Sequence, residues 1–345
     1  MAPNPCYNGF MEREGPDRPW VIGHDSAVKW LQSMVASGRV SQAYLLAGPA
    51  RVGKTTLALY FARLLQCTSI STKPCGQCSA CRRIERGVYP DVRLLGGSGR
   101  SIGIGEIRAL QIDIALAPFE SAQRVCIICD FHLATLEAAN CLLKTLEEPP
   151  ASTILVLTAD HSEQLLPTIV SRCQVLNLQP LPAQLVSQAL QQYWHADPGK
   201  ADLLAHISQG RIGWAIEAAV SDQVMSDRDK YLLLLEQSLH QGILERLDLA
   251  RALAQVPDEL PIVLQHWETW WRDLLHVKVG IGRPLLNMDR QDSIRYESRA
   301  VRLDQTVEAL KSLQDCAQQL DNNVNPQLAL EAMLLQLPTT AGPEA

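Results

Sequence analysis

The fold is decided by the stretch Leu45-Leu-Ala-Gly48-Pro-Ala-Arg-Val-Gly53-Lys54-Thr55, which contains the phosphate-loop pattern GxxxxGK[ST]. An apolar run at 43–47 precedes the loop and predicts a buried strand. Behind the loop, apolar residues recur at helical spacing. A phosphate loop joins a strand to a helix in this order, so the stretch predicts a parallel α/β domain, the alternative being a chance match on a tight turn.

The loop residues have the chemistry that nucleotide phosphates need. Gly48 and Gly53 allow backbone N–H groups to close around phosphate oxygens, and the start of the following helix adds its positive dipole end. Lys54 can reach the β- and γ-phosphates, and the hydroxyl of Thr55 can ligate Mg²⁺. The predicted nucleotide-binding set also includes Arg51, Val52 and Thr56. We therefore expect ATP and Mg²⁺ as ligands of this loop.

Four cysteines follow the phosphate-loop helix within one short insert, residues 67–81. Their spacing is Cys-x7-Cys-x2-Cys-x2-Cys, and the residues are Cys67, Cys75, Cys78 and Cys81. Four thiolates can close a tetrahedral Zn²⁺ site that has no open catalytic position. The alternative is free or redox-active thiols, but several cysteines at x2 spacing in an intracellular chain favour a structural zinc ion.

A second nucleotide motif is predicted at Asp130, which ends an apolar strand and would lie near Mg²⁺, through a water molecule. A hydrolysing ATPase of this kind usually has a glutamate next, which polarises the attacking water, whereas this chain has Phe131. Phenylalanine cannot accept a proton. This predicts a site that holds ATP but hydrolyses it poorly, unless another base substitutes. Thr158, at the end of the next apolar run, is a candidate γ-phosphate sensor.

Two arginines further along the chain are candidate phosphate ligands. Arg172 follows a short turn and can be either a surface charge of its own subunit or an arginine finger that enters a neighbouring nucleotide site. From the residues alone, the surface charge is favoured. Arg211 stands at the start of a predicted helix and could face the phosphates from above.

The composition bounds the class of protein. The chain has 345 residues, of which 47% are hydrophobic and 20% charged, and its length suggests two or three domains. No apolar run reaches the ~18 residues of a membrane span, and the N-terminus has no apolar signal region. We therefore expect a cytoplasmic protein. The net charge of −6 predicts that any nucleic-acid contact is local or depends on partner subunits.

The pattern of elements predicts three domains between two tails. An α/β P-loop domain with a parallel sheet occupies 20–178, a helical lid 179–221 and an all-α domain 222–338. Residues 1–19 and 339–345 are the predicted tails. In the third domain we predict helices at 231–241, 243–255, 261–279, 298–320 and 326–337. Trp267, Trp270 and Trp271 fall at helical spacing and are assigned to a core or a subunit interface.

These motifs together resemble the clamp-loader subunits of bacterial DNA polymerase III, a group of AAA+ proteins. The resemblance covers about residues 20–338. It rests on the phosphate loop, the four-cysteine insert, and three further stretches: NCLLKTLEEPP at 140–150, SRC at 171–173 and NNVNPQLALEAMLLQL at 322–337. The spacing between Cys67 and Cys75 is one residue shorter than is often found in that family, a change that a loop tolerates.

Within that family, two branches compete. The tau/gamma motor subunits carry an acid pair, as in DEAH, and tau has a long C-terminal extension. This chain instead reads Asp130-Phe131-His132 and lacks the extension. Both features resemble the stator-like delta-prime branch, with an ATP-hydrolysing motor as the alternative. A homohexameric branch-migration or remodelling ATPase fits less well, because of the cysteine insert and the helical C-terminal third. A nucleotide or small-molecule kinase fits less well because the sequence has no substrate-pocket signature.

The resemblance implies a function that the residues alone do not give. It implies an AAA+ P-loop domain, a helical lid and a helical collar in a ring of unlike subunits that places the sliding clamp on primed DNA. The implied partners are tau/gamma, delta, the clamp and, through the assembled complex, primer-template DNA. Arg172 would be an arginine finger acting in trans. Because the loop residues are intact, ATP binding without efficient hydrolysis is expected.

Overall fold

The computed structural model describes residues 19–340 apart from 71, 98, 283–284 and 322–323. Most of the two predicted tails therefore lies outside the described residues. The chain forms two compact units, the first comprising residues up to 196 together with 210–217, and the second 197–209 together with 218 onward. This division splits the predicted lid, 179–221, between the two units. The three-domain scheme stays a prediction.

The first unit is built on a five-stranded sheet in which every pairing is parallel. The strand order is β2-β3-β4-β1-β5. The bounds are β1 Ala43–Ala47, β2 Val92–Gly96, β3 Arg124–Cys129, β4 Thr153–Ala159 and β5 Gln174–Asn177. Strands β1, β3 and β4 are buried along their whole length, as expected of parallel strands covered on both faces.

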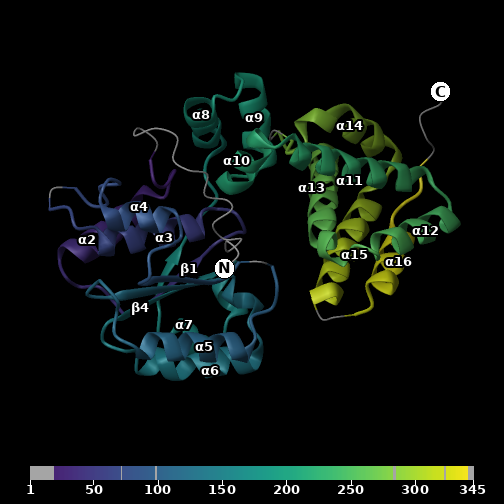
Figure 1. Cartoon of the computed structure of the whole chain (residues 1–345). Coiled ribbons are helices and arrows are strands. Elements are labelled where there is room, and N and C mark those ends of the chain that lie inside the picture. The colour runs from purple at the N-terminus through teal and green to yellow at the C-terminus, as the bar shows by residue number, and fades with distance from the viewer. Residues whose placement is uncertain (1–18, 71, 98, 283–284, 322–323, 341–345) are drawn as a thin grey trace. The chain divides into compact units, whose positions relative to one another are not determined.

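Helices cover both faces of this sheet (Figure 1). One face carries α2 (Asp25–Ala36), α3 (Lys54–Gln66) and α4 (Ser79–Glu85), and the other carries α5 (Ile104–Ala115), α6 (Leu136–Glu147) and α7 (Pro167–Val170). Two hydrophobic clusters fill the spaces between the helices and the sheet. The predicted α/β class is confirmed, and so are the strand predicted at 43–47 and the apolar strand predicted before Asp130.

The strand order decides where the functional loops lie. β4 pairs with both β1 and β3, and Ala47 lies opposite Ala159 in the register. The carboxyl ends of β1, β3 and β4 therefore meet at one edge of the sheet. The phosphate loop leaves β1 there, Asp130 follows β3, and Asp160 follows β4. Ligands bind at such an edge in open parallel sheets.

The rest of the described chain, from residue 183 onward, is helical. The middle helices are α8 (Ala183–Trp194), α9 (Pro198–Ile207) and α10 (Ile212–Val220). The later ones are α11 (Asp222–His240), α12 (Ile243–Leu253), α13 (Leu260–Val279), α14 (Gln291–Ala300), α15 (Leu303–Asp321) and α16 (Pro326–Gln336). The predicted single helix 298–320 is wrong. Val301 has an extended backbone, φ −83° and ψ 138°, and is buried, so the helix breaks there into α14 and α15.

The second unit has its own core. Trp267, Trp270 and Trp271 on α13 are all fully buried and form part of one large hydrophobic cluster of this unit. Trp270 and Trp271 pack edge to face at 5.1 Å, and the indole N–H of Trp267 donates to the carbonyl of Tyr231 at 2.8 Å. The core assignment of the three tryptophans is confirmed.

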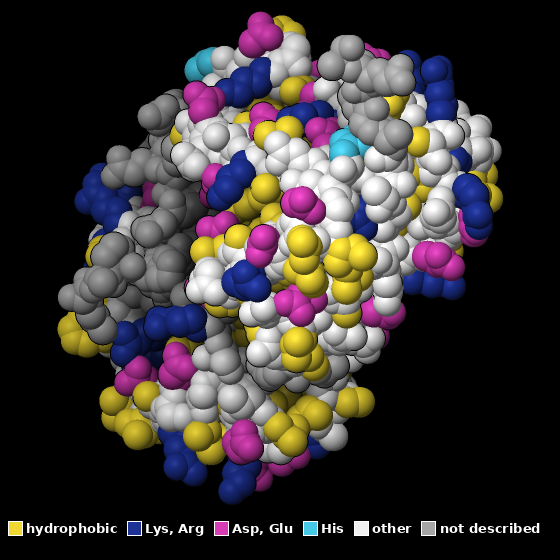
Figure 2. All heavy atoms as spheres, turned by 90° about the vertical axis from the view of Figure 1, so that its right-hand side faces the viewer, with side chains coloured by type: hydrophobic (Ala, Val, Ile, Leu, Met, Phe, Trp, Pro, Cys, Tyr) yellow, Lys and Arg dark blue, Asp and Glu magenta, His cyan; other side chains and the backbone are white. Residues whose placement is uncertain are grey.

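Surface charge is mixed. On the face shown in Figure 2, lysines and arginines are interspersed with acidic and hydrophobic side chains, without one extended basic surface. This agrees with the net charge of −6. Among the helices of the described residues, none combines the length and the apolar composition that crossing a bilayer requires.

Candidate functional site

The phosphate loop has positive φ angles at three positions, two of which are glycines. Gly48 has φ +154° and Gly53 φ +112°, and Arg51 also has a positive φ, of 62°. A Cβ atom at Gly48 would lie 2.4 Å from the carbonyl oxygen of Leu178, so a side chain does not fit there. The N–H of Gly48 donates to the carbonyl of Ala159 at 3.1 Å. The loop is therefore attached to the end of β4.

Lys54, the first residue of α3, is held inside this loop. Its side chain is only 5% exposed. The ammonium donates to the carbonyl oxygens of Gly48 at 2.6 Å and Pro49 at 3.1 Å, and to Oδ1 of Asp160 at 2.7 Å. An ammonium has three donors, and these three contacts use all of them. The predicted phosphate-binding lysine is thus in place and is satisfied by the protein itself.

Asp160 is a site residue that the sequence analysis missed. It lies 106 residues from Lys54 in the chain and is brought to it by the pairing of β1 with β4. Its only sequence signal is that it is the first acid after an apolar strand, the same signal that identified Asp130. Once the strand order shows that β4 lies beside β1, an acid directly after β4 is expected to lie beside the phosphate loop.

Asp130 and His132 complete the polar end of the phosphate-loop site, here called the pocket. Nε2 of His132 lies 3.9 Å from Oδ2 of Asp160, and side-chain atoms of Asp130, His132 and Asp160 all lie within 4.8 Å of one another. Burial raises the pKa of Asp130, although Lys54 and His132 oppose that rise. Two carboxylates beside one lysine make this end of the pocket suited to a cation such as Mg²⁺ that accompanies a phosphate.

Two of the three threonines of the predicted site, Thr55 and Thr158, lie near this end. The side-chain oxygen of Thr55 lies 3.7 Å from the sulfur of Cys129, the last residue of β3. Thr158 is fully buried, and its hydroxyl accepts the backbone N–H of Asp130 at 2.8 Å. Thr158 therefore fixes the turn that carries Asp130. Its role as a γ-phosphate sensor stays a prediction.

Phe131 points away from the pocket. The ring is 1% exposed and belongs to the hydrophobic cluster beneath α5 and α6. The position where related ATPases have a glutamate thus contributes a core side chain here. The side chain that reaches the pocket from this turn is that of His132, two residues beyond Asp130.

The start of α10 lies against the phosphate loop. The N–H of Gly213 donates to the carbonyl of Arg51 at 2.8 Å, and the side chain of Arg51 forms an ion pair with Glu217. Arg211 is 9% exposed. Burial lowers its pKa, and the nearby charge of Arg51 lowers it further. Two guanidinium groups that approach each other in a partly buried place favour an anion beside them.

Two more loop residues are positioned from the N-terminal side. Val52 is fully buried, and its carbonyl lies 3.0 Å from Nε2 of His24, a residue that the sequence analysis did not assign to the site. His24 also lies near the open side of Gly53, 3.8 Å from where a Cβ atom would stand. Thr56 is half-buried in the first turn of α3.

Arg172 lies apart from these loop residues, after α7. One guanidinium nitrogen donates to the carbonyl of Thr168 and another to Oε1 of Glu147, both at 2.8 Å. Its side chain is 35% exposed. The guanidinium of Arg172 is therefore held at the surface of this chain and is partly accessible to solvent.

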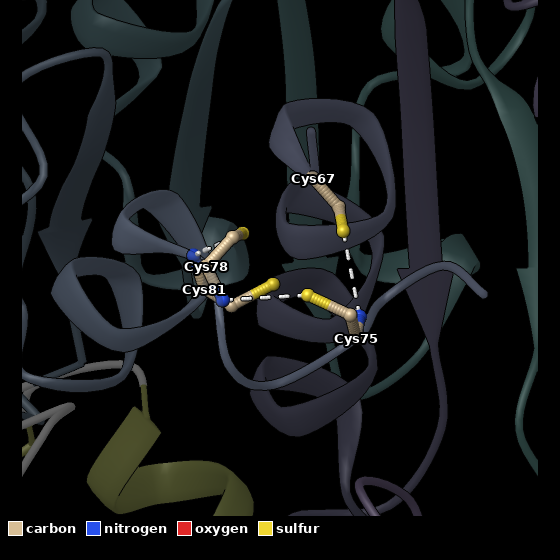
Figure 3. A group of neighbouring side chains, drawn as sticks. All are labelled: Cys67, Cys75, Cys78 and Cys81. Atoms are coloured by element: carbon tan, nitrogen blue, oxygen red, sulfur yellow. Dashed lines mark hydrogen bonds between the residues drawn. The ribbon is translucent and has the colours of Figure 1, made fainter. Parts of the chain in front are cut away.

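The four cysteines of the insert converge (Figure 3). Cys67 ends the helix α3, Cys75 and Cys78 lie in the connecting loop, and Cys81 lies on α4, which the sequence analysis did not predict. Their sulfur atoms all lie within 4.8 Å of one another. In a tetrahedral zinc site with Zn–S bonds of about 2.3 Å, the sulfurs are about 3.8 Å apart. The cluster therefore has the composition and size of a site for one metal ion.

Backbone N–H groups favour thiolates in this cluster. Each of Cys75, Cys78 and Cys81 points its N–H at the sulfur of the preceding cysteine at 3.4 Å. Burial raises the pKa of Cys78, but N–H groups that point at its sulfur outweigh burial and lower this pKa to about 6. Hydrogen bonds from Cys78 and Gln77 lower the pKa of Cys75, whereas burial raises that of Cys67 and Cys81. A metal ion would stabilise all four thiolates.

The parallel sheet, the phosphate loop after β1, the acid after β3 and the helical C-terminal unit define a P-loop protein of the AAA+ class. Comparison with known proteins specifies the family. Residues 23–182 match the family "DNA polymerase III, delta subunit", and residues 225–339 match "DNA polymerase III, delta subunit, C terminal". The chain belongs to the clamp-loader family of DNA polymerase III subunits, and it resembles the delta-prime member of that family over most of its length.

One relative in particular supports this placement. The delta' subunit of Bacillus subtilis is 31% identical over 320 residues, which is 90% of this chain and 94% of that protein. The tau subunit of the same organism is 25% identical over 365 residues, and the match spans 99% of this chain but 64% of tau. Among solved structures, a gamma-subunit-related protein of Thermotoga maritima is similar, with 17% identity, a TM-score of 0.41 and coverage of 88% of this chain and 97% of that one.

Proposed function

We propose that this chain is a stator-like subunit of a clamp loader, which helps a complex of unlike subunits to place the sliding clamp on primed DNA. Its partners would be the tau/gamma motor subunits, delta, the clamp and, through the assembled complex, primer-template DNA. The observation that carries the proposal is that this chain keeps the phosphate-binding loop but lacks the acid that would activate water. The phosphate loop is intact, whereas the residue after Asp130 is buried in the core and offers no acid to a water molecule.

In this proposal the pocket binds ATP with Mg²⁺ and releases little phosphate. The N–H groups in the first turn of α3 have no intrahelical partners and can receive phosphate oxygens. Lys54, Arg51 and Arg211 supply positive charge, and Asp130 can hold the waters of Mg²⁺. Lys54→Ala should abolish nucleotide binding by the pure chain. If the pure chain binds nucleotide but a complex reconstituted with it does not load the clamp, only the nucleotide-binding part of the proposal stands.

Arg172 is the proposed contribution to catalysis, because its guanidinium is partly exposed and its bonds to Thr168 and Glu147 lie at the surface. It would act as an arginine finger in the nucleotide site of a neighbouring motor subunit. The test is reconstitution with motor, delta and clamp, followed by ATPase and clamp-loading measurements on primed DNA. Unchanged rates with Arg172→Ala would remove this role.

The cysteine cluster is proposed to hold one structural Zn²⁺ ion. The ion would have a structural role, because four sulfur ligands leave no coordination position for a substrate. Cys67 at the end of α3 and Cys81 on α4 would be cross-linked through the metal, which fixes the insert to the phosphate-loop helix.

A second candidate is a motor with intrinsic ATPase activity, in which His132 replaces the missing acid. One observation favours it: the imidazole lies 3.9 Å from Asp160 and close to Asp130, as a base beside its orienting acid would. Measuring phosphate release by the isolated chain decides between the candidates. The motor requires turnover that His132→Ala abolishes, whereas the stator-like subunit shows little turnover in either form.

A further inference from the structure

We propose that Asp160 is a built-in competitor of the nucleotide: its carboxylate occupies the phosphate-binding ammonium of Lys54 and thereby sets the affinity of the pocket for phosphate-bearing ligands. The proposal rests on the nucleotide binding proposed above and adds a residue that controls it. The ligand class is the nucleoside di- or triphosphate of the proposed nucleotide site, whose phosphate oxygens would bind this ammonium.

The first step of the argument is the count of hydrogen bonds at Lys54. All three donors of the ammonium are used, by the carbonyls of Gly48 and Pro49 and by Oδ1 of Asp160. The side chain is 5% exposed, so water cannot readily replace a missing partner. A phosphate oxygen can bind the ammonium only if one of the three present acceptors leaves.

The second step identifies which acceptor leaves. The carbonyls of Gly48 and Pro49 belong to the loop backbone, and the N–H of Gly48 ties that backbone to β4. Asp160 contributes a side chain that is 29% exposed and can rotate about its own bonds. It is also the one acceptor with a negative charge, so an incoming phosphate would repel it from the same ammonium. The carboxylate is therefore the group that the phosphate displaces.

The third step is the place to which the carboxylate can move. Nε2 of His132 lies 3.9 Å from Oδ2 of Asp160. A small rotation brings this pair within hydrogen-bonding distance, so the displaced carboxylate keeps a partner. The pocket then has two arrangements, with Lys54 bound to Asp160 or to phosphate. The apparent affinity for nucleotide is reduced by the fraction of molecules in the first arrangement.

The test is calorimetric titration of the full chain with ATP, ADP and adenosine in the presence of Mg²⁺. Asp160→Asn keeps the shape of the side chain and removes its charge. Asp248→Asn, which removes one charge at an exposed position outside the site, is the matched control. We expect Asp160→Asn to bind ATP and ADP at least about tenfold more tightly, a difference of about 1.4 kcal/mol. Its affinity for adenosine should match that of the wild type, and Asp248→Asn should match the wild type for all three ligands.

The outcomes separate this proposal from the one on which it rests. If the wild type binds ATP and Asp160→Asn binds it equally or more weakly, the competitor role is overturned while nucleotide binding stands. An equal gain for adenosine also overturns it, because adenosine has no phosphate. If neither form binds any nucleotide, both proposals fail. Should Asp160→Asn not fold, as judged by its melting curve, Asp160→Ser carries the same comparison.

Discussion

Arg172 and Glu147 form an ion pair at the surface of the first unit, with a nitrogen-to-oxygen distance of 2.8 Å. Their side chains are 35% and 50% exposed, so solvent screens the pair and it stabilises the fold by about 0–1 kcal/mol. An arginine whose ion pair stabilises its own chain so little can leave that pair without unfolding the chain. This separation of stability from function makes Arg172 a clean target for mutation.

Arg172→Ala should lower the ATPase rate of the reconstituted complex by about 10³-fold or more, because an arginine finger stabilises the charge of the phosphoryl-transfer transition state. The melting temperature of the variant chain should stay within a few degrees of the wild type. The matched control is Arg93→Ala, since Arg93 is also a half-exposed surface arginine with one carboxylate partner, Asp113, at 2.6 Å. A rate loss of the same size in the control would contradict a specific role for Arg172.

The cysteine cluster should carry one zinc ion per chain, as measured by elemental analysis of protein purified without added metal. Cys78→Ser should lose most of this zinc and lower the melting temperature, because a serine hydroxyl does not replace a thiolate ligand. Cys173→Ser is the control, since Cys173 lies outside the cluster. A folded, metal-free wild-type chain with unchanged stability in chelator would contradict the zinc site.

Asp91 predicts a pH dependence of stability. It is fully buried and accepts the N–H groups of Phe119, Glu120 and Ser121 at 2.6–3.0 Å. Burial raises the pKa of Asp91, but these hydrogen bonds outweigh burial and lower it below its usual value of 3.8. The folded chain thus binds this proton less tightly than the unfolded chain. The stabilisation is complete above about pH 5 and is lost as the pH falls through the folded-state pKa.

Asp91→Asn should therefore destabilise the chain by about 2–3 kcal/mol at pH 7, because an amide cannot accept all of these hydrogen bonds. The difference from the wild type should shrink as the pH is lowered from 5 toward 3, as followed by thermal melting. Asp248→Asn, at an exposed position, is the matched control. A constant difference across this range would show that the charge of Asp91 is not the stabilising feature.

Gly48→Ala should destabilise the first unit by about 1–3 kcal/mol, because its φ of +154° and the carbonyl of Leu178 both exclude a Cβ atom. Nucleotide binding should fall with it, since the loop would have to shift. Gly105→Ala is the matched control. Gly105 lies in α5 with nothing within 4 Å of its Cβ position, so alanine there should be neutral or stabilise by up to about 1 kcal/mol. Equal effects in urea unfolding would contradict the steric explanation.

Features encoded by short spacings could be predicted from the sequence. The phosphate loop and the four cysteines each lie within fifteen residues, so their spacing alone indicates which atoms converge. Most helices and strands followed from periodicity, which reports the buried face of an element directly. The break at Val301 did not, because a buried apolar residue looks the same to a periodic pattern whether or not its backbone stays helical.

The tertiary structure alone decided the contacts across the sheet. Lys54 and Asp160 are 106 residues apart, and they meet because β1 lies beside β4, an order that no local pattern reports. It also decided that Phe131 packs into the core while His132 lies beside Asp160. The left-handed backbone at Asp130 begins the turn from which these two side chains point in different directions. Motifs made of neighbouring residues can be recognised from the sequence. The balance of charge in the pocket depends instead on which strand ends the fold brings together.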